Sequence, residues 1–219
     1  MQYGGGVLSL WADSAGNLYA GGTFGGMGGA PYTSGVAYWD GSVWHALFIG
    51  TNGIGLIDQL GVTHGKLYAL GTWGVKKWYG SMSDDTDHWT NLGFPSAPGF
   101  LPSALWVGSD GTVIASGTIS QNGNDVTAVM KWTGVSWTLL GAANDRNRGF
   151  SAFARTLNGV LYAGGNFMNF AGMRADNIVR YDGLHWNTVG EGPEGVRTTL
   201  SIPVGISFTH GLFLPLLRR

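Results

Sequence analysis

Residues Gly159 to Trp186 read GVLYAGGNFMNFAGMRADNIVRYDGLHW, and this stretch carries the clearest signal in the chain. Its opening block, GVLYAGGNF, returns as GNLYAGGTF from Gly16, as GKLYALGTW from Gly65 and as GTVIASGTI from Gly111. The leading glycines of these blocks lie 49, 46 and 48 residues apart. Self-similarity at a fixed period of this length indicates an array of repeated structural units.

A second block follows the first in each unit. It reads VAYWDGSVWHAL from Val36, VMKWTGVSWTLL from Val129 and IVRYDGLHWNTV from Ile178, with a variant in the second unit. One tryptophan anchors each block, and the anchors are Trp44, Trp89, Trp137 and Trp186. Because both blocks keep one period, we predict repeats of about 48 residues. The predicted repeats are 7–53, 54–103, 104–151 and 152–201, with a partial fifth at 202–219, all in one domain over 1–219.

Each repeat has the pattern of four short antiparallel strands. In the first repeat, apolar segments at Val7–Ala12, Leu18–Thr23 and Val36–Trp39 precede the anchor tryptophan, and turns rich in Asn-Gly and Asp-Gly separate the strands of the repeats. One such sheet cannot bury both of its faces, whereas sheets stacked around an axis can. The predicted fold class is therefore all-β, a β-propeller of four-stranded antiparallel blades. The anchor tryptophans are expected to pack between neighbouring sheets, with sugar stacking as the alternative.

The composition argues against several classes of partner and site. The chain has 219 residues, 44% hydrophobic and 11% charged, with 39 glycines and a net charge of −1. This near-neutral balance lacks the positive field that nucleic-acid binding needs, so no nucleic-acid partner is expected. The absence of cysteine excludes disulfides, thiolate metal sites and a cysteine nucleophile. No apolar run approaches a membrane span, so we expect no membrane insertion, and no signal sequence is recognisable at the start.

Residues Tyr162 to Gly192 resemble a known repeat type. They are similar to the kelch-like propeller repeats of bacterial secreted and surface proteins and of fungal Rax2-type polarity proteins. The resemblance implies an extracellular or surface-displayed protein, on a cell or a virion, that serves adhesion or recognition. Kelch-like propellers also include the copper enzyme galactose oxidase, whose Tyr–Cys crosslink this cysteine-free chain cannot form, so no cofactor is expected.

Differences between the repeats point to a binding surface. Between the second and third strands, long loops are predicted at Phe24–Gly35, Ile119–Ala128 and Phe167–Asn177, and the second repeat has almost none. Loops on a rigid scaffold commonly carry binding residues. The predicted ligand-binding residues are Tyr32, Asn122, Asn124, Asp125, Phe170, Arg174 and Asp176. The alternative is a set of ordered connections without a ligand.

The second repeat instead enlarges its next turn, between Gly80 and Trp89. Asp84, Asp85 and Asp87 lie there, and Ca²⁺ prefers such oxygen ligands, but the spacing is not that of an EF-hand and an exposed polar turn is the favoured interpretation. Trp73, Trp78 and Tyr79 form either a surface aromatic patch or core. We predict no catalytic residues, because the histidines follow the repeat pattern and no nucleophile motif occurs.

The fifth unit is incomplete. Ile202–His210 has the pattern of a first strand, and no third or fourth strand follows. Three outcomes stay open: a five-bladed ring with one thin blade, a four-bladed ring with a packed tail, or a partner chain (or second copy) that completes the open sheet edges. The predicted function is a non-enzymatic recognition or display module for a glycan or a surface protein. The alternatives are a structural subunit of a larger surface or virion assembly and a polysaccharide-active enzyme.

Overall fold

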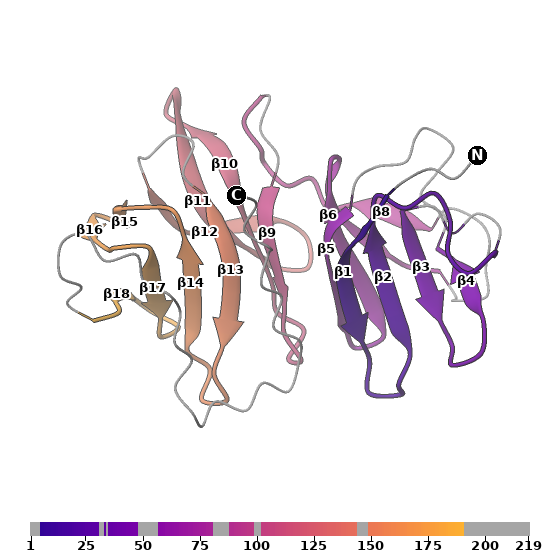
Figure 1. The fold of residues 1–219 in the computed structure, drawn as a ribbon. Coiled ribbons are helices and arrows are strands. Elements are labelled where there is room, and N and C mark those ends of the chain that lie inside the picture. Colours follow the sequence, from indigo (N-terminus) through magenta and orange to yellow (C-terminus); the bar gives the residue numbers. More distant parts are fainter. Residues whose placement is uncertain are drawn as a thin grey trace. The chain divides into compact units, whose positions relative to one another are not determined.

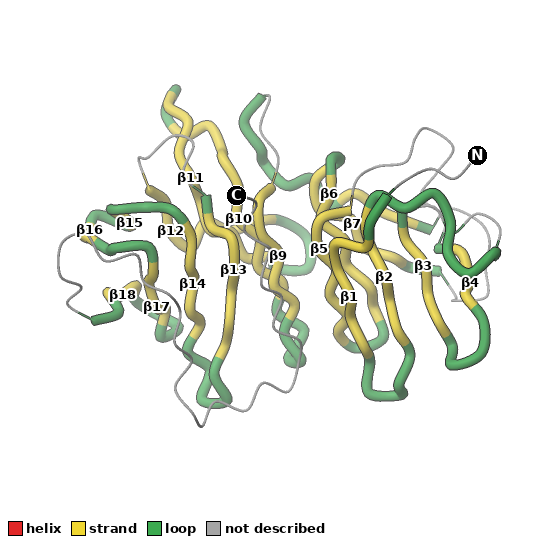
Figure 2. Tube along the Cα trace, viewed as in Figure 1, coloured by secondary structure: helices red, strands yellow, loops and turns green. Residues whose placement is uncertain are grey.

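A computed structural model describes residues 5–30, 33, 35–47, 57–80, 88–98, 102–143 and 149–190. The described residues form strands joined by turns and loops, with no helix among them (Figure 2). They make up four four-stranded antiparallel sheets and one small hairpin. The fold class predicted from the sequence is confirmed: the protein is all-β and of the β-propeller type, with four blades.

The strands of each blade follow one another in chain order (Figure 1). Blade 1 contains β1 (Val7–Ala12), β2 (Leu18–Gly22), β3 (Val36–Trp39) and β4 (Trp44–Ala46). Blade 2 contains β5 (Ile57–Thr63), β6 (Lys66–Gly71), β7 (Gly74–Trp78) and β8 (Trp89–Asn91). Blade 3 contains β9 (Pro102–Val107), β10 (Val113–Gln121), β11 (Asn124–Trp132) and β12 (Trp137–Ala143). Blade 4 contains β13 (Phe150–Arg155), β14 (Leu161–Gly165), β17 (Ile178–Tyr181) and β18 (Trp186–Thr188), and it carries the β15 (Asn169–Phe170)–β16 (Met173–Arg174) hairpin.

The chain divides into two compact units. One comprises Met1–Phe94 with Val107–Val113, and the other comprises Pro95–Trp106 with Ile114–Arg219. The first strands of the third and fourth blades are β9, which begins at Pro102, and β13, which begins at Phe150. The predicted fifth unit, 202–219, lies outside the described residues. None of the described segments is a helix long and apolar enough to cross a membrane.

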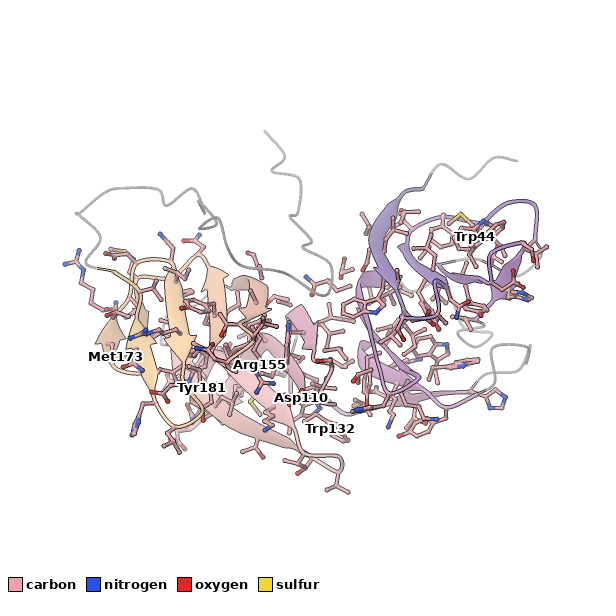
Figure 3. The ribbon with its side chains drawn as sticks, turned by 90° about the horizontal axis from the view of Figure 1, so that it is seen from below. Trp44, Asp110, Trp132, Arg155, Met173 and Tyr181 are labelled. Atoms are coloured by element: carbon pink, nitrogen blue, oxygen red, sulfur yellow. The ribbon has the colours of Figure 1, made fainter. Side chains whose placement is uncertain are left out.

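An aromatic pair closes the last hairpin of every blade. The residue that ends the third strand is paired with the anchor tryptophan across the hairpin, and the ring centroids lie 5.0–5.5 Å apart. The four pairs are Trp39–Trp44, Trp78–Trp89, Trp132–Trp137 and Tyr181–Trp186, and Figure 3 labels Trp44, Trp132 and Tyr181. Directly opposed aromatic side chains stabilise an antiparallel pair by roughly 0.2–1 kcal/mol each. The repeated block is therefore explained by a local contact.

The anchor tryptophan also ties one blade to the blade before it. The indole Nε1–H of Trp89 donates to the carbonyl of Leu47 at 3.4 Å, and that of Trp186 donates to the carbonyl of Leu140 at 2.8 Å. Each acceptor lies three residues after the anchor of the preceding blade, Trp44 or Trp137. Trp89 and Trp186 are 9% and 8% exposed, so the prediction that anchors pack between sheets is confirmed for these two blades.

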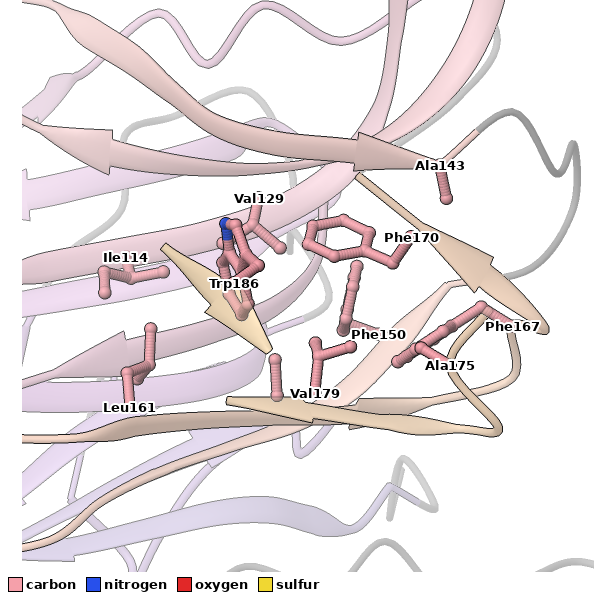
Figure 4. Close-up of a cluster of buried hydrophobic side chains, with 11 residues drawn as sticks. Ile114, Val129, Ala143, Phe150, Leu161, Phe167, Phe170, Ala175, Val179 and Trp186 are labelled. Carbon is pink, nitrogen blue, oxygen red and sulfur yellow. The ribbon is translucent and has the colours of Figure 1, made fainter. Parts of the chain in front are cut away.

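The core of the second unit is a compact group of aromatic and aliphatic side chains (Figure 4). Phe150 lies at its centre, 4.7 Å from Phe167 and 5.1 Å from Phe170 between ring centroids. Trp186 closes the group edge-on against Phe170 at 4.8 Å. Burying aromatic surface is the main favourable term available to a chain with so few charges.

A glycine ends the second strand of blades 1, 2 and 4, at Gly22, Gly71 and Gly165, and Gly117 stands at the equivalent position inside the longer β10. In blade 4 the register between β13 and β14 shifts next to this position, and Gly165 pairs with Phe150. A Cβ on Gly165 would collide with the carbonyl oxygen of Gly149 and lie 2.7 Å from the Cα of Phe150. Blade 1 has the same shift, and a Cβ on Gly22 would collide with the carbonyl oxygen of Gly6. The bulge thus brings two backbones too close for any side chain.

Candidate recognition surface

Each blade has two chemically different ends. One end, termed the turn end, holds the hairpin turn between the first two strands and the turn between the last two. The other end, termed the connection end, holds the segment that joins the second strand to the third. Antiparallel order requires this separation, because successive connections alternate between the two ends of a sheet.

At the turn end, acidic side chains are engaged by their own turns. Asp13 accepts hydrogen bonds from the amides of Ala15 and Asn17 at 2.9 and 3.0 Å. Asp182 accepts from the amides of Leu184 and His185 at 2.9 and 2.7 Å. Such carboxylates replace backbone partners in a tight turn. The aspartates therefore recur in the turns for a structural reason. Their carboxylate oxygens already accept hydrogen bonds from backbone amides and are not available to a ligand.

The Asp40 carboxylate is the most strongly held of these groups. Its Oδ2 lies 2.7 Å from Nε2 of His45, and its Oδ1 accepts from the amides of Ser42 and Val43 at 2.8 and 2.9 Å. The contact with His45, followed by those from Val43 and Ser42, holds the pKa of Asp40 well below its ordinary value. In the Asp182 turn, the amides of His185 and Leu184 likewise lower the pKa of the carboxyl.

These lowered pKa values predict acid sensitivity. A carboxyl whose pKa is lower in the folded state stabilises the fold above its unfolded pKa of about 3.9 and loses that contribution as pH falls through the folded value. We therefore expect thermal stability to fall between about pH 4 and pH 2, and D40N to flatten that fall because asparagine keeps the turn acceptor without the titration. Melting curves at pH 2–6 measure the effect. An unchanged pH profile in both D40N and the doubly substituted D40N/D182N would contradict the assignment.

The connection end varies from blade to blade. In blade 2, β6 and β7 are joined by Thr72 and Trp73 alone. In blade 1, the described part of the connection contains a bridge between Met27 and Ala30, and the amide of Gly35 donates to the carbonyl of Phe24 at 2.9 Å. In blade 4 the connection contains the β15–β16 hairpin. The same strands thus present a different surface in each blade, and this end is where one blade can acquire a property that the others lack.

Blade 3 corrects the sequence-based prediction of a loop at Ile119–Ala128. These residues extend β10 and β11 into a long hairpin whose turn consists of Asn122 and Gly123. Both turn residues have positive φ, 51° and 77°, as a two-residue hairpin of the I′ type requires. The strands run on because this dipeptide reverses the chain without ending the ladder. The hairpin holds Ser120 against Asp125, whose Oδ1 accepts from the hydroxyl at 2.9 Å.

The β15–β16 hairpin is fixed to the end of β12. The amide of Ala171, in the hairpin turn, donates to the carbonyl of Ala142 at 2.9 Å. Phe170 inserts beside Gly141, where a Cβ would lie 2.8 Å from its ring. The hairpin is therefore a rigid part of the second unit, and the residues it carries have defined positions.

Ala171 is in an unfavourable conformation, with φ of 49°. A left-handed conformation costs a non-glycine residue roughly 1–2 kcal/mol, while glycine adopts it readily. We expect A171G to raise the free energy of unfolding by about 0.5–1 kcal/mol and Tm by about 2–4 °C. The control is A152G, in β13 at ordinary φ, which should lower Tm. A Tm for A171G at or below that of the unchanged chain would contradict the prediction.

The structure places the predicted ligand-binding residues in three groups. Asn122, Asn124 and Asp125 lie together on the tip of the β10–β11 hairpin, and both asparagines are exposed. Arg174 and Asp176 lie at the end of the β15–β16 hairpin, with Arg174 Nε 3.8 Å from Asp176 Oδ1. Phe170 is fully buried and belongs to the core, so it presents no surface to a ligand. Tyr32 lies outside the described residues, as do Asp84, Asp85 and Asp87 of the candidate metal turn.

The aromatic residues of blade 2 do not form one surface patch. Trp78 is 1% exposed and belongs to the core of the first unit, and Trp73 packs against that core. Tyr79 is 50% exposed, and Lys77 Nζ lies 4.8 Å from its ring centroid. Lys76 Nζ lies 4.8 Å from the ring centroid of Trp73. Cationic side chains thus cover the aromatic faces that remain accessible.

Within the described ranges, no group of three His, Asp or Glu side chains is arranged to hold a metal ion. No protein-family model and no curated protein matches the chain.

Proposed function

We propose that this protein is a non-enzymatic recognition module that binds its ligand at the connection end of blades 3 and 4. The observation that carries the proposal is the contrast between the two ends. At the turn end, blades 1 and 4 carry turns closed by their own carboxylates, whereas the described connections differ between the blades, and those of blades 3 and 4 present exposed polar residues on hairpins. Surface that departs from the repeat is surface the repeat does not need for folding.

A glycan is the ligand that this chemistry favours. The exposed amides of Asn122 and Asn124 each supply both a donor and an acceptor, which suits the hydroxyl groups of a sugar. The pairing of Arg174 with Asp176 adds donors and acceptors while leaving the local charge balanced. The net charge of −1 gives no electrostatic preference for a polyanion. A protein ligand on the same surface is the alternative within this proposal.

The likeness of Tyr162–Gly192 to kelch-like repeats of secreted and surface proteins supports the same function. It favours an extracellular or surface-displayed protein, on a cell or a virion, that acts in adhesion. The fold by itself hosts many functions, so the argument for recognition depends on the surface residues and not on the fold.

Binding to an oligosaccharide array tests this proposal. The variant N122G/N124A/R174A removes three exposed side chains, and N122G keeps the positive-φ turn. We expect it to bind the strongest array ligand at least about tenfold more weakly, a loss of about 1.4 kcal/mol. The matched control is L184A, an 82% exposed residue at the turn end of blade 4, which should bind normally. Equal binding by both variants, or catalytic turnover of an array sugar, would overturn the proposal.

A structural role in a larger assembly is the second candidate, and blade 3 favours it. Its outer strand, β12, lies at the edge of its sheet; Trp186 and Ala171 occupy the carbonyls of Leu140 and Ala142 in its second half, and its first half exposes 38% of Leu139. Long edge strands can pair with another chain. A mass measurement in solution distinguishes the candidates: a stable monomer at high concentration counts against assembly, and a defined oligomer that L139K disrupts supports it.

A further inference from the structure

Trp186 and the β15–β16 hairpin, together termed the docking module of blade 4, hold the last strand of blade 3. The indole Nε1–H of Trp186 donates to the carbonyl of Leu140 at 2.8 Å. The amide of Ala171, in the hairpin turn, donates to the carbonyl of Ala142 at 2.9 Å. Gly141 lies between the two acceptors, and a Cβ there would lie 2.8 Å from Trp186 Nε1. The module therefore receives a strand with two carbonyls on one edge and a glycine between them.

The connection of blade 1 is built like this module. A bridge joins Met27 to Ala30, as Phe170 pairs with Met173 in blade 4. The two residues of each turn have matching positive φ angles, 57° and 77° in blade 1 and 49° and 80° in blade 4. In both blades the amide just before the third strand donates to the carbonyl of the phenylalanine that begins the connection, at 2.9 Å. Blade 1 thus carries a second copy of the docking module.

Two hydrogen-bond donors of blade 1 meet at this module. Gly28 and Trp44 stand in the places of Ala171 and Trp186. A Cβ on Gly28 would lie 3.3 Å from Trp44 Nε1, so the indole N–H lies beside the hairpin turn. Among the described residues of the first unit, none accepts a hydrogen bond from the Gly28 amide or the Trp44 indole. A small buried core beneath the hairpin keeps the module in place without a docked strand.

The strand that such a module receives is marked in the sequence. A glycine stands four residues after the anchor tryptophan in three blades, at Gly93, Gly141 and Gly190. Blade 1 has Phe48 at this position. Blade 2, whose anchor bonds to Leu47 of blade 1, joins its second and third strands by a short turn and has no hairpin there. A hairpin in one blade therefore goes with a glycine in the strand that it contacts, because a side chain at that position would meet the module.

We propose that the module of blade 1 binds the last strand of blade 4, β18, of a second copy of this chain. Val189 and Gly190 take the places of Leu140 and Gly141, and the indole of Trp44 donates to the carbonyl of Val189. Among the described residues of the second unit, none donates to this carbonyl. Each unit thus has a docking side that its own described residues leave unused. Two unlike and complementary sides join copies head to tail, at a surface separate from the one proposed for the glycan.

The mass of the full chain in solution, measured by sedimentation over a range of concentrations, is the first test. We expect the unchanged chain to associate, and W44F, which keeps an aromatic ring but loses the indole donor, to associate at least about tenfold more weakly. The matched control is W39F, in the ring that faces Trp44 across the hairpin, and it should associate like the unchanged chain. A chain that is monomeric at every concentration would overturn the proposal, and it would mean that β18 of the same chain fills the module.

A mixing experiment tests the head-to-tail arrangement. In G190N, asparagine tolerates the positive φ of 75° and places a side chain where the module needs glycine. We expect G190N and W44F each to associate weakly alone. Mixed in equal amounts, they should associate like the unchanged chain but stop at two copies, because each variant keeps the side that the other lacks. A mixture that stays monomeric while the unchanged chain associates would mean that another surface joins the copies, and it would overturn the proposal.

Discussion

Replacing Gly165 by alanine is expected to lower the free energy of unfolding by about 3 kcal/mol. The new Cβ would collide with the carbonyl oxygen of Gly149, and that oxygen is held by the amide of Asn166 at 3.0 Å. Relief would require the bulge between β13 and β14 to open, since a backbone cannot rotate away as a side chain can. Chemical denaturation of G165A, followed by tryptophan fluorescence, measures the loss.

The control for this prediction is G149A, at the residue directly before β13, on the other side of the same bulge. A Cβ there would meet only the side chain of Ser103, at 3.4 Å, which is ordinary contact. We expect G149A to change stability by less than about 1 kcal/mol. The equivalent substitution in blade 1, G22A, should be as harmful as G165A, because it meets the carbonyl of Gly6 in the same way. Equal stability of G165A and G149A would show that the bulge tolerates a side chain.

Replacing Phe170 by alanine is expected to cost about 3–5 kcal/mol of stability. The ring is fully buried and contacts Phe150 and Trp186, so its removal leaves a cavity in the core of the second unit (Figure 4). It also removes the contact that holds the β15–β16 hairpin over Gly141. Denaturant unfolding gives the loss directly, and F170L should recover a large part of it by refilling the volume.

The matched control is M168A, two residues earlier in the same connection. The side chain of Met168 is 49% exposed, so its truncation should cost less than about 1 kcal/mol. If F170A unfolded at the same denaturant concentration as M168A, the core assignment of Phe170 would be wrong and its predicted role at a binding surface would regain support.

The strand pattern of this protein can be predicted because each repeat marks its own turns. Asp-Gly and Asn-Gly pairs and the anchor tryptophans give the four strands of a blade almost to the residue, as at Val7–Ala12 and Val36–Trp39. Local chemistry determines these features, since positive φ and cross-strand aromatic contact involve residues close together in the chain. The blades could therefore be expected before any coordinates existed.

The surface residues were harder to predict, because their exposure depends on contacts far apart in the sequence. Phe170 has the neighbours of a loop residue in sequence, yet it is buried because the hairpin folds back onto β12. The Asn122-Gly123 pair is a local mark of the two-residue turn between β10 and β11. The equivalent connections of blades 1 and 4 are irregular, so comparison of the repeats predicts a loop there instead. The bond from Trp186 to Leu140 spans 46 residues and has no sequence mark beyond the tryptophan itself.

The indole bond between blades gives the array a direction. Trp89 and Trp186 each donate toward the N-terminal neighbour and never toward the C-terminal one among the described pairs. A blade thus has one side that donates the indole hydrogen bond and another side that accepts it. A transplanted or duplicated blade should join only in the original orientation, which would let the array grow by tandem duplication while rejecting inverted copies.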